Sequence, residues 1–415
     1  MTPSPAELPP PGPRALEHPA LAAAVAEVEA ELVALRRDLH AHPEPSWEEH
    51  RTTEVVAATL AAAGLSPVPA ATPTGLLCDV GDRPEMGTPL VVLRADLDAL
   101  RMPDVKDVPY RSTVPGVCHA CGHDVHTAAA VGAAMALARV LPPGCGRVRV
   151  VFQPAEESIP SGARALAEAG TVAGAGAVFA LHCDPQVPIG QVGLSAGPIT
   201  SASDMVEITL RGPGGHTARP HRTADLVNVA ARLAVDLPAA LDRLTDPRDG
   251  VNLTFGALLA GDAANVIPAE AVLRGSLRAT ARSGWEQAAR LLPGLVAGVA
   301  DTRGATWSLD HRVGSPPMEN DPWATEVMGR AAGAVLGATR VRPTRQSGGG
   351  EDFSWLCEEA PGAFLRLGVT APGVEPVDIH TAAFDVDEAA VGLGARLLAG
   401  AAVEALVALA AARRP

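Results

Sequence analysis

Short continuous apolar runs alternate with helical stretches along most of the chain. Polar residues end these runs in the segments "PLVVLRADLDAL", "RVRVVFQPAEE" and "GAVFALHCDP". Uninterrupted Val, Leu and Phe runs are typical of strands that are buried on both faces. The pattern therefore predicts an α/β fold in which helices connect the strands of one buried, mixed sheet.

The N-terminal pattern is helical after a proline-rich start. Residues 1–20 predict a disordered leader, because proline-rich segments favour extended conformations. Residues 21–40 predict one amphipathic helix. A second helix is expected from Trp47 to Ala63, where Gly64 ends it.

From about Ser203 the pattern changes to alternation of polar and apolar residues. It is clearest in "DMVEITLRG", "EAVLRGSLRAT" and "TWSLDHRV", and helical stretches at 222–243 and 284–301 lie between the strand-like segments. Alternation of period two predicts an antiparallel sheet with one covered face. We therefore expect residues 203–312 to form an inserted α+β domain of the ferredoxin-like type.

The α/β pattern resumes after this insert. A helix is expected over 321–337, followed by a strand at "GAFLRLGV" and a C-terminal helix. The larger domain is thus predicted to be discontinuous, with residues 21–202 and 313–415. Two domains also suit a length of 415 residues, which exceeds what one hydrophobic core usually serves.

Charge and composition narrow the function classes. A formal net charge of -14 argues against binding to nucleic acid or to an anionic membrane, because both require basic surface. We find no apolar run of the roughly 18 residues that a membrane span needs. The N-terminus lacks the basic and apolar regions of a secretory signal, so we expect a cytoplasmic protein whose six cysteines are reduced.

The stretch "CHACGHDVHT" combines thiols and imidazoles at close spacing. Cys121 and His123 are good ligands for zinc and similar divalent metals. A second cysteine, Cys118, forms a C-x-x-C pair with Cys121, which leaves a redox role open at this point. The motif alone does not decide between these interpretations.

Other candidate ligands follow predicted strands. Asp96 and Asp98, the pair Glu156 and Glu157, and His182 are each expected just past the end of a strand. Because ligands of α/β sheets bind at the carboxyl ends of strands, these side chains are expected at one edge of the sheet. Of two adjacent carboxylates, one can bind a metal while the other accepts a proton from water.

The number of candidate donors predicts more than one metal. They exceed what one tetrahedral zinc with an open position uses, and suit two divalent cations with one bridging ligand. Zn, Mn, Co and Ni all accept such mixed ligation. The reaction class typical of this arrangement is hydrolysis. The five donors are Cys121, His123, Glu157, His182 and His380.

A set of short motifs occurs along the chain, and their joint presence in this order is specific. In order they are "DLHAHPE", "LRADLDAL", "HACGHDVHTA", "FQPAEE", "GGHTARPH", "NVIP", "GSLRA" and "GGEDFSW". With them, the chain resembles the di-metal amidohydrolases of the aminoacylase and carboxypeptidase G superfamily. It is most similar to the branch of hippurate hydrolase and the indole-acetyl-amino-acid hydrolases. The resemblance spans nearly the whole folded chain and implies a zinc-exopeptidase-like catalytic domain.

The resemblance assigns roles to residues of the larger domain. Cys121, His123, Glu157, His182 and His380 match the metal ligands of the family. In the same way, Glu156 matches the general base that activates water and later protonates the leaving nitrogen. The match at Asp98 is to an acidic residue that steadies a metal ligand.

The resemblance also assigns roles to the insert. His216 matches a histidine that stabilises the oxyanion in the active site of a partner subunit. Asn265, Arg278 and Gly350 match positions that contact the substrate. On the same analogy, the insert is a lid that also forms a homodimer.

The implied function is hydrolysis of an N-acyl or N-aroyl amino acid to a carboxylic acid and a free amino acid. A dipeptidase or carboxypeptidase activity is the alternative, because a dipeptide also presents an amide near a carboxylate. Arg101 and the triple glycine at 348–350 depart from the common family pattern and bear on the choice of substrate. A non-catalytic binding protein would have lost a ligand or the base, yet every motif residue is present.

Overall fold

The computed structural model of the protein describes residues 18–412 and divides into two compact units. Of the described residues, unit 1 comprises 18–197, 319–345 and 355–412, and unit 2 comprises 198–318 and 346–354. The compact insert is thus a few residues wider at each end than the predicted 203–312, and it also includes a later segment. Most of the expected leader, residues 1–17, lies outside the described residues.

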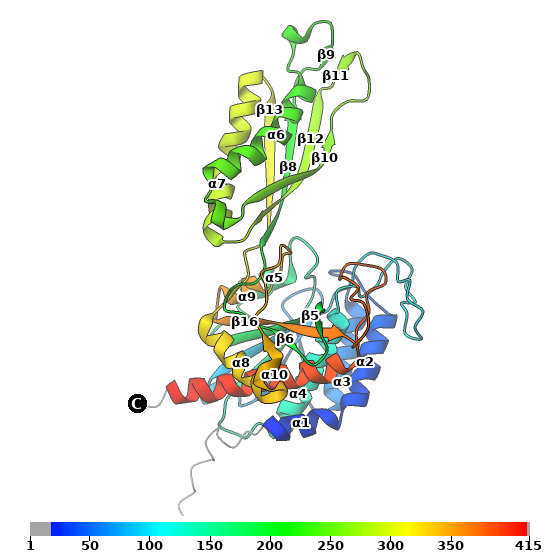
Figure 1. The fold of residues 1–415 in the computed structure, drawn as a ribbon, viewed down its shortest axis with the longest axis vertical. Coiled ribbons are helices and arrows are strands. Elements are labelled where there is room, and N and C mark those ends of the chain that lie inside the picture. The colour runs from blue at the N-terminus through cyan, green and yellow to red at the C-terminus, as the bar shows by residue number, and fades with distance from the viewer. Residues whose placement is uncertain (1–17, 413–415) are drawn as a thin grey trace, which may run out of the picture. The chain divides into compact units, whose positions relative to one another are not determined.

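Unit 1 is built on an eight-stranded mixed sheet of order β1-β2-β4-β3-β5-β16-β6-β15. Figure 1 labels β5, β6 and β16 of this sheet. Its central strands β4, β3, β5 and β16 are parallel to one another, whereas β2 and β6 run antiparallel to their central neighbours. The predicted α/β class with a mixed sheet is confirmed. The strands are β1 (Val68–Pro69), β2 (Leu76–Gly81), β3 (Leu90–Asp96), β4 (Arg147–Gln153), β5 (Ala175–Pro188), β6 (Val192–Gly193), β15 (Val341–Arg342) and β16 (Gly362–Thr370), with the short β14 (Glu319–Asn320) outside this sheet.

The helices of unit 1 differ from the prediction at the N-terminus. The single helix expected over 21–40 is two helices, α1 (His18–Ala26) and α2 (Glu29–Ala41). Both pack against α4 (His123–Val140), so the apolar periodicity does not reveal the turn between them. The remaining helices are α3 (His50–Ala62), α5 (Gly162–Glu168), α8 (Pro322–Leu336) and α10 (Ala389–Ala412). Two short elements, β7 (Gly197–Pro198) and α9 (Ser354–Cys357), each span a point in the sequence where the chain passes from one unit to the other.

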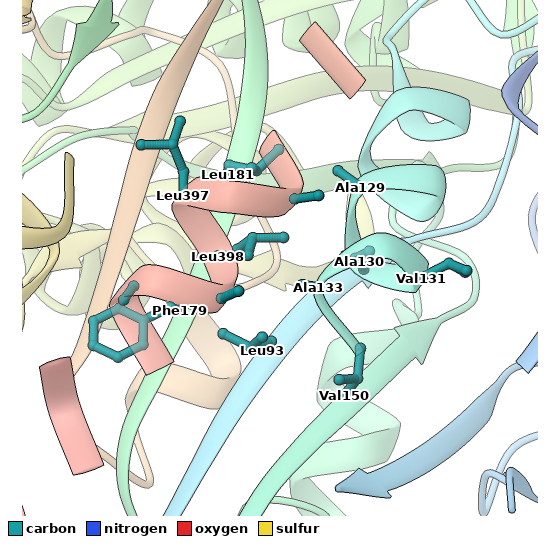
Figure 2. Close-up of a cluster of buried hydrophobic side chains, with 14 of the residues drawn as sticks. Leu93, Ala129, Ala130, Val131, Ala133, Val150, Phe179, Leu181, Leu397 and Leu398 are labelled. Carbon is teal, nitrogen blue, oxygen red and sulfur yellow. The ribbon is translucent and has the colours of Figure 1, made fainter. Parts of the chain in front are cut away.

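The core of unit 1 lies where α4 and α10 pack on β3 and β5 (Figure 2). Small residues allow these two helices to approach closely. A side chain at Gly132 would meet Leu32 at 2.4 Å and Ala395 at 2.9 Å. Since even one added methyl group meets other atoms there, α4 is held firmly in the core. The N-terminal end of this helix, which begins at His123, therefore has a rigid support.

The C-terminal helix corrects one prediction. Contrary to the absence of long apolar runs expected from the sequence, α10 is long and apolar enough to cross a membrane by length and composition. In the structure it packs against α4 and α8, and most of its residues are buried. Its small residues, mainly alanine and glycine, are those of a helix in the core of a folded unit.

Unit 2 is a four-stranded antiparallel sheet, of order β10-β12-β8-β13, with two helices (Figure 1). Along β8, Val206, Ile208 and Leu210 are buried while Met205 and Arg211 are exposed, so one face is covered. The chain order β-α-β-β-α-β is that of a ferredoxin-like fold. The elements are β8 (Ala202–Arg211), α6 (Leu226–Leu244), β10 (Asn252–Leu259), β12 (Glu270–Ala279), α7 (Arg282–Ala300) and β13 (Thr306–Ser315), and a separate pair is formed by β9 (Gly215–His216) and β11 (Val266–Ile267).

Candidate metal centre

The candidate site forms where the N-terminus of α4 meets the ends of β3 and β4. Gly122 precedes α4 with a left-handed φ of 92°, and a Cβ there would lie 2.7 Å from the sulfur of Cys183. Only glycine suits both the conformation and the space. This tight turn places Cys121 before the helix and His123 at its first residue.

Two triads of metal-donor atoms share one residue. Cys121, His123 and His182 form one triad, and Cys121, Glu157 and His380 form the other. Within each triad the donor atoms lie within 4.8 Å of one another. The structure thus brings together all five predicted ligands in unit 1, with the thiol of Cys121 common to both groups.

The two buried imidazoles are oriented by backbone carbonyl groups. Nδ1 of His123 donates to the carbonyl of Asp98 at 2.8 Å, and Nδ1 of His182 donates to the carbonyl of Cys183 at 2.7 Å. Because a carbonyl can only accept, each Nε2 is left to act as a donor atom toward a metal. Nε2 of His123 is buried without a hydrogen-bond partner among the described residues, as expected of a metal ligand.

The charges of the site call for a cation. Burial and the nearby carboxylates of Glu157 and Glu156 raise the pKa of the Cys121 thiol well above its ordinary value. Burial lowers the pKa of His123, but Asp96 and Asp98 outweigh it and raise that pKa to about 10. A divalent cation would take the place of these protons and stabilise the thiolate. The sulfur, nitrogen and oxygen donors therefore fit two divalent metals.

His380 completes the second triad from a strained position. It has a φ of 58°, which is left-handed and disfavoured for a residue with a Cβ. Its backbone N–H donates to the carbonyl of Ala120 at 2.7 Å, and its Nε2 lies 3.0 Å from Oε1 of Glu157. Strain of this kind is typical of functional sites.

The expected place of His182 at the end of a strand is wrong. His182 lies inside β5, which continues to Pro188 because its pairing with β16 extends that far. His182 pairs with Arg366 in this ladder. The carboxyl-end rule nevertheless holds for the β3 and β4 residues.

Asp98 organises the turn that carries the two glutamates. Its carboxylate accepts the backbone N–H of Glu156 at 3.1 Å and that of Glu157 at 2.9 Å, and also the hydroxyl of Ser46 at 2.6 Å. This fixes the two neighbouring side chains on one turn. The carboxylate of Glu156 lies within 4.8 Å of the donor atoms of both His123 and Glu157.

The four remaining predicted residues belong to unit 2, where they form two groups. His216 is exposed on β9, its Nδ1 accepts the N–H of Ala218 at 3.0 Å, and the carbonyl of Asn265 accepts the N–H of Thr217 at 3.2 Å. Arg278 donates to the carbonyl of Gly348 at 2.9 Å, close along the chain to Gly350. A side chain at Gly350 would meet Ser203 at 2.7 Å.

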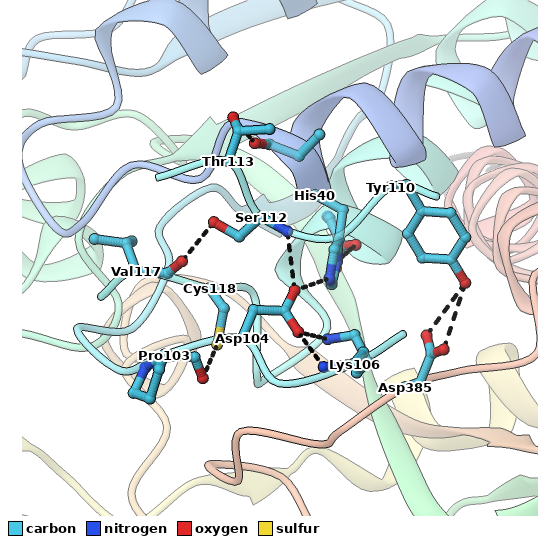
Figure 3. Close-up of polar contacts among 12 residues, drawn as sticks. His40, Pro103, Asp104, Lys106, Tyr110, Ser112, Thr113, Val117, Cys118 and Asp385 are labelled. Atoms are coloured by element: carbon cyan, nitrogen blue, oxygen red, sulfur yellow. Dashed lines mark hydrogen bonds and ion pairs between the residues drawn. The ribbon is translucent and has the colours of Figure 1, made fainter. Parts of the chain in front are cut away.

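A second buried polar cluster, not anticipated from the sequence, supports the start of α4. Asp124 accepts from Nε of Arg36 at 2.7 Å and from Nδ1 of His40 at 2.7 Å. Asp104 in turn lies 3.3 Å from His40 and 3.1 Å from Lys106, and Figure 3 shows this part of the cluster. The motif "DLHAHPE" contains His40 and was the available signal for it.

The candidate ligand His182 is also supported by a neighbouring histidine, His126. Asp96 accepts from Nδ1 of His126 at 2.6 Å, and Nε2 of His126 accepts the backbone N–H of Cys183 at 2.9 Å. Both nitrogens of His126 are thus engaged. Asp96, which was considered as a ligand, holds this histidine and also pairs with Arg94 at 2.6 Å.

The thiols show no redox pair. All six cysteines are free in the structure. Cys118 directs its thiol to the carbonyl of Pro103 at 3.7 Å, whereas Cys121 faces the metal donors.

An α/β unit with a mixed sheet, two metal-donor triads and an adjacent carboxylate defines a di-metal hydrolase. Residues 92–404 match Peptidase family M20/M25/M40. The chain belongs to this family, so the recognition made from the motifs is confirmed.

Individual relatives agree with the family. The chain is 34% identical over 374 residues to an N-acetylcysteine deacetylase of Bacillus subtilis, covering 90% of this chain and 96% of that protein. It also resembles the crystal structure of the Bacillus subtilis YxeP protein, a dinuclear metal binding peptidase of the M20 family. That comparison has a TM-score of 0.77 at 31% identity and covers 92% of this chain and 99% of the other.

A third relative has a different name. The chain is 44% identical over 370 residues to a Rhodococcus jostii protein named glutamate–cysteine ligase 2-3. This match covers 89% of the chain but spans only 46% of that protein's length. More than half of the relative therefore lies outside the match, and its name says nothing of the metal centre.

Proposed function

We propose that the protein is a metal-dependent amidohydrolase that cleaves N-acyl or N-aroyl amino acids to a carboxylic acid and a free amino acid. The observation that carries the proposal is the pair of donor triads that share Cys121. The carboxylate of Glu156 lies beside them and is not a member of either triad. The deacetylase activity in the name of the Bacillus subtilis relative supports the same substrate class.

Metal binding and proton transfer are assigned to different residues of the site. Cys121, His123, Glu157, His182 and His380 would hold two divalent cations, which supply Lewis-acid chemistry to polarise the amide carbonyl and acidify water. Glu156 accepts the proton that water loses as it attacks the carbonyl carbon. When the C–N bond breaks, Glu156 returns this proton to the leaving nitrogen.

Asp98 acts in this proposal as a positioning residue. It touches the backbone of both glutamates, and its backbone carbonyl orients His123. Its carboxylate is buried, and it lies 3.3 Å from Nδ1 of His123. It thereby keeps the base and two of the ligands in register.

The roles of unit 2 belong to the same proposal. We assign it as a lid and dimerisation domain, in which His216 stabilises the oxyanion and Arg278, Asn265 and Gly350 contact the substrate. The guanidinium of Arg278 suits a carboxylate, because it can donate two parallel hydrogen bonds. A cytoplasmic homodimer containing Zn, Mn, Co or Ni completes the proposal.

A substrate panel tests the proposal. Purified protein is analysed for metal and then assayed with N-acetyl amino acids, N-benzoyl amino acids and dipeptides. The proposal expects turnover of the N-acyl compounds that chelation abolishes and added metal restores. Preference for dipeptides would instead establish an exopeptidase, and no turnover of any amide would refute both.

Mixed dimers test the role of His216. His216→Ala subunits are combined with Glu156→Gln subunits, each inactive by itself. Partial recovery of activity in verified mixed dimers is expected if each site uses His216 of the other subunit. No recovery would refute the shared site but not the amidohydrolase activity.

A further inference from the structure

A short segment outside the metal centre holds the turn that carries both glutamates. This clamp segment, Ser46–Glu49, precedes α3. Glu49 accepts the backbone N–H of Ala155 through Oε1 at 2.7 Å, and Ser46 donates to Asp98 at 2.6 Å. The indole N–H of Trp47 donates to the carbonyl of Pro160 at 3.3 Å. The clamp segment thus bonds directly to Ala155 before the two glutamates and to Pro160 after them. It also contacts the glutamates indirectly, through Asp98.

The contact with Ala155 coincides with backbone strain. Ala155 has a φ of 53° and is fully buried, and Trp47 on the clamp segment has a φ of 67°. With His380, they are the non-glycine residues of positive φ within 18–412. A left-handed alanine is strained and persists only where surrounding contacts hold it. The carboxylate of Glu49 accepts the N–H of this strained residue.

The buried position of Glu49 disfavours the charged form of its carboxyl group. Its side chain is 0% exposed, and its second oxygen accepts the hydroxyl of Thr74 at 2.6 Å. Burial raises the pKa of this carboxyl to about 7, and the hydrogen bond from Thr74 opposes the rise. A buried carboxyl costs free energy unless it is hydrogen-bonded, and here the bonds go to Ala155 and Thr74.

We propose that Glu49 is a positioning residue for hydrolysis. Its bond to the N–H of Ala155 fixes the left-handed conformation that sets the directions of the Glu156 and Glu157 side chains. Within residues 18–412, the side chain of Glu49 bonds to Ala155 and Thr74 and to none of the five candidate metal ligands. This inference rests on the function proposed above for Glu156.

Three variants separate positioning from stability. Glu49→Ala is expected to lower kcat about 10- to 100-fold with KM changed less than about threefold, because a small misplacement of a catalytic group has effects of this size. Glu49→Gln is expected to stay within about threefold of wild type, since its amide can accept from Ala155 and donate to Thr74. The control Thr74→Val removes the other partner of Glu49 and is expected to lower Tm while kcat stays within about threefold of wild type.

Glycine at 155 provides a specific rescue. Glycine adopts positive φ without strain, so the turn no longer needs Glu49 to hold it. The double variant Glu49→Ala with Ala155→Gly is therefore expected to regain at least about fivefold in kcat over Glu49→Ala alone. Bound metal should remain near the wild-type amount in every variant.

Hydrogen exchange provides a readout that needs neither substrate nor metal. The N–H groups of Glu156 and Glu157 bond to Asp98 rather than to Glu49. In the metal-free protein their exchange is expected to accelerate at least about tenfold in Glu49→Ala and to stay unchanged in Thr74→Val. Unchanged exchange in Glu49→Ala, or equal acceleration in both variants, would overturn the positioning role. If the wild-type protein turned over no amide, the proposed function would fail while this exchange result still decided the role of Glu49.

Discussion

The sulfur of Cys121 lies 3.3 Å from Nε2 of His182, although 61 positions separate them in the chain. One residue lies on the turn before α4, and the other lies inside β5. The same sulfur also belongs to the triad with Glu157 and His380. Cys121 is therefore the residue through which the two halves of the candidate metal centre are joined.

Cys121→Ala is expected to reduce the metal content at both positions, because it removes a donor from each triad. His380→Ala removes a donor from one triad only, so it should lower the content by about one equivalent per chain. Elemental analysis after dialysis against a weak chelator measures the difference. Equal metal loss in the two variants would contradict a shared thiol.

Glu156→Gln is expected to lower kcat by about 10²- to 10⁴-fold, because glutamine cannot accept the proton from water. Metal content should stay near wild type, since Glu156 is not in either triad built on Cys121. Steady-state kinetics on the best substrate of the panel, with metal analysis of the same sample, tests both statements. The base would have to be sought elsewhere if the variant kept normal turnover.

Glu49 is expected to make stability fall as pH rises. Its pKa is raised from 4.5 to about 7 in the folded protein, so the folded state binds more protons than the unfolded state between these values. The free energy of unfolding should therefore decrease across this window, by about 3 kcal/mol for a shift of this size, and level off above it. Urea titrations of wild type and Glu49→Gln from pH 4.5 to 7 isolate the contribution. A constant difference between the two proteins would contradict it.

Gly132→Ala is expected to destabilise unit 1 by about 1–3 kcal/mol, because the added methyl group meets Leu32 and Ala395 in the closely packed core. Gly298→Ala in α7 is the control, since a side chain there meets nothing within 4 Å. That change should stabilise the protein by about 0.5–1 kcal/mol through helix propensity. Chemical denaturation of the two variants gives opposite signs if this packing is correct.

Much of the fold follows from local patterns. The runs at β3 and β4 are mostly apolar, and β3 is buried along its whole length, because helices cover the sheet. The alternation along β8 reflects one covered face. The turn between α1 and α2 leaves no such trace, because both helices direct apolar residues to α4. The full extent of β5 also depends on a partner strand, β16, that lies far along the chain.

The candidate site was predictable as a set of residue types but not as a network. Thiol and imidazole donors stand out in "CHACGHDVHT", and their chemistry limits what they can bind. The contacts behind them do not stand out. Glu49 reaches Ala155 across 106 positions, and Arg36 reaches Asp124 across 88. Such bonds depend on how the helices pack, which no short motif encodes.

The φ of 58° at His380 has a consequence for how this protein can be improved. Glycine or asparagine would occupy that backbone more comfortably, yet neither offers an imidazole nitrogen. Selection for heat resistance alone would thus favour replacements at position 380 that erase the chemistry. Substitutions that raise thermal stability and keep activity must therefore lie at other positions. Screens for such variants should measure activity from the first round.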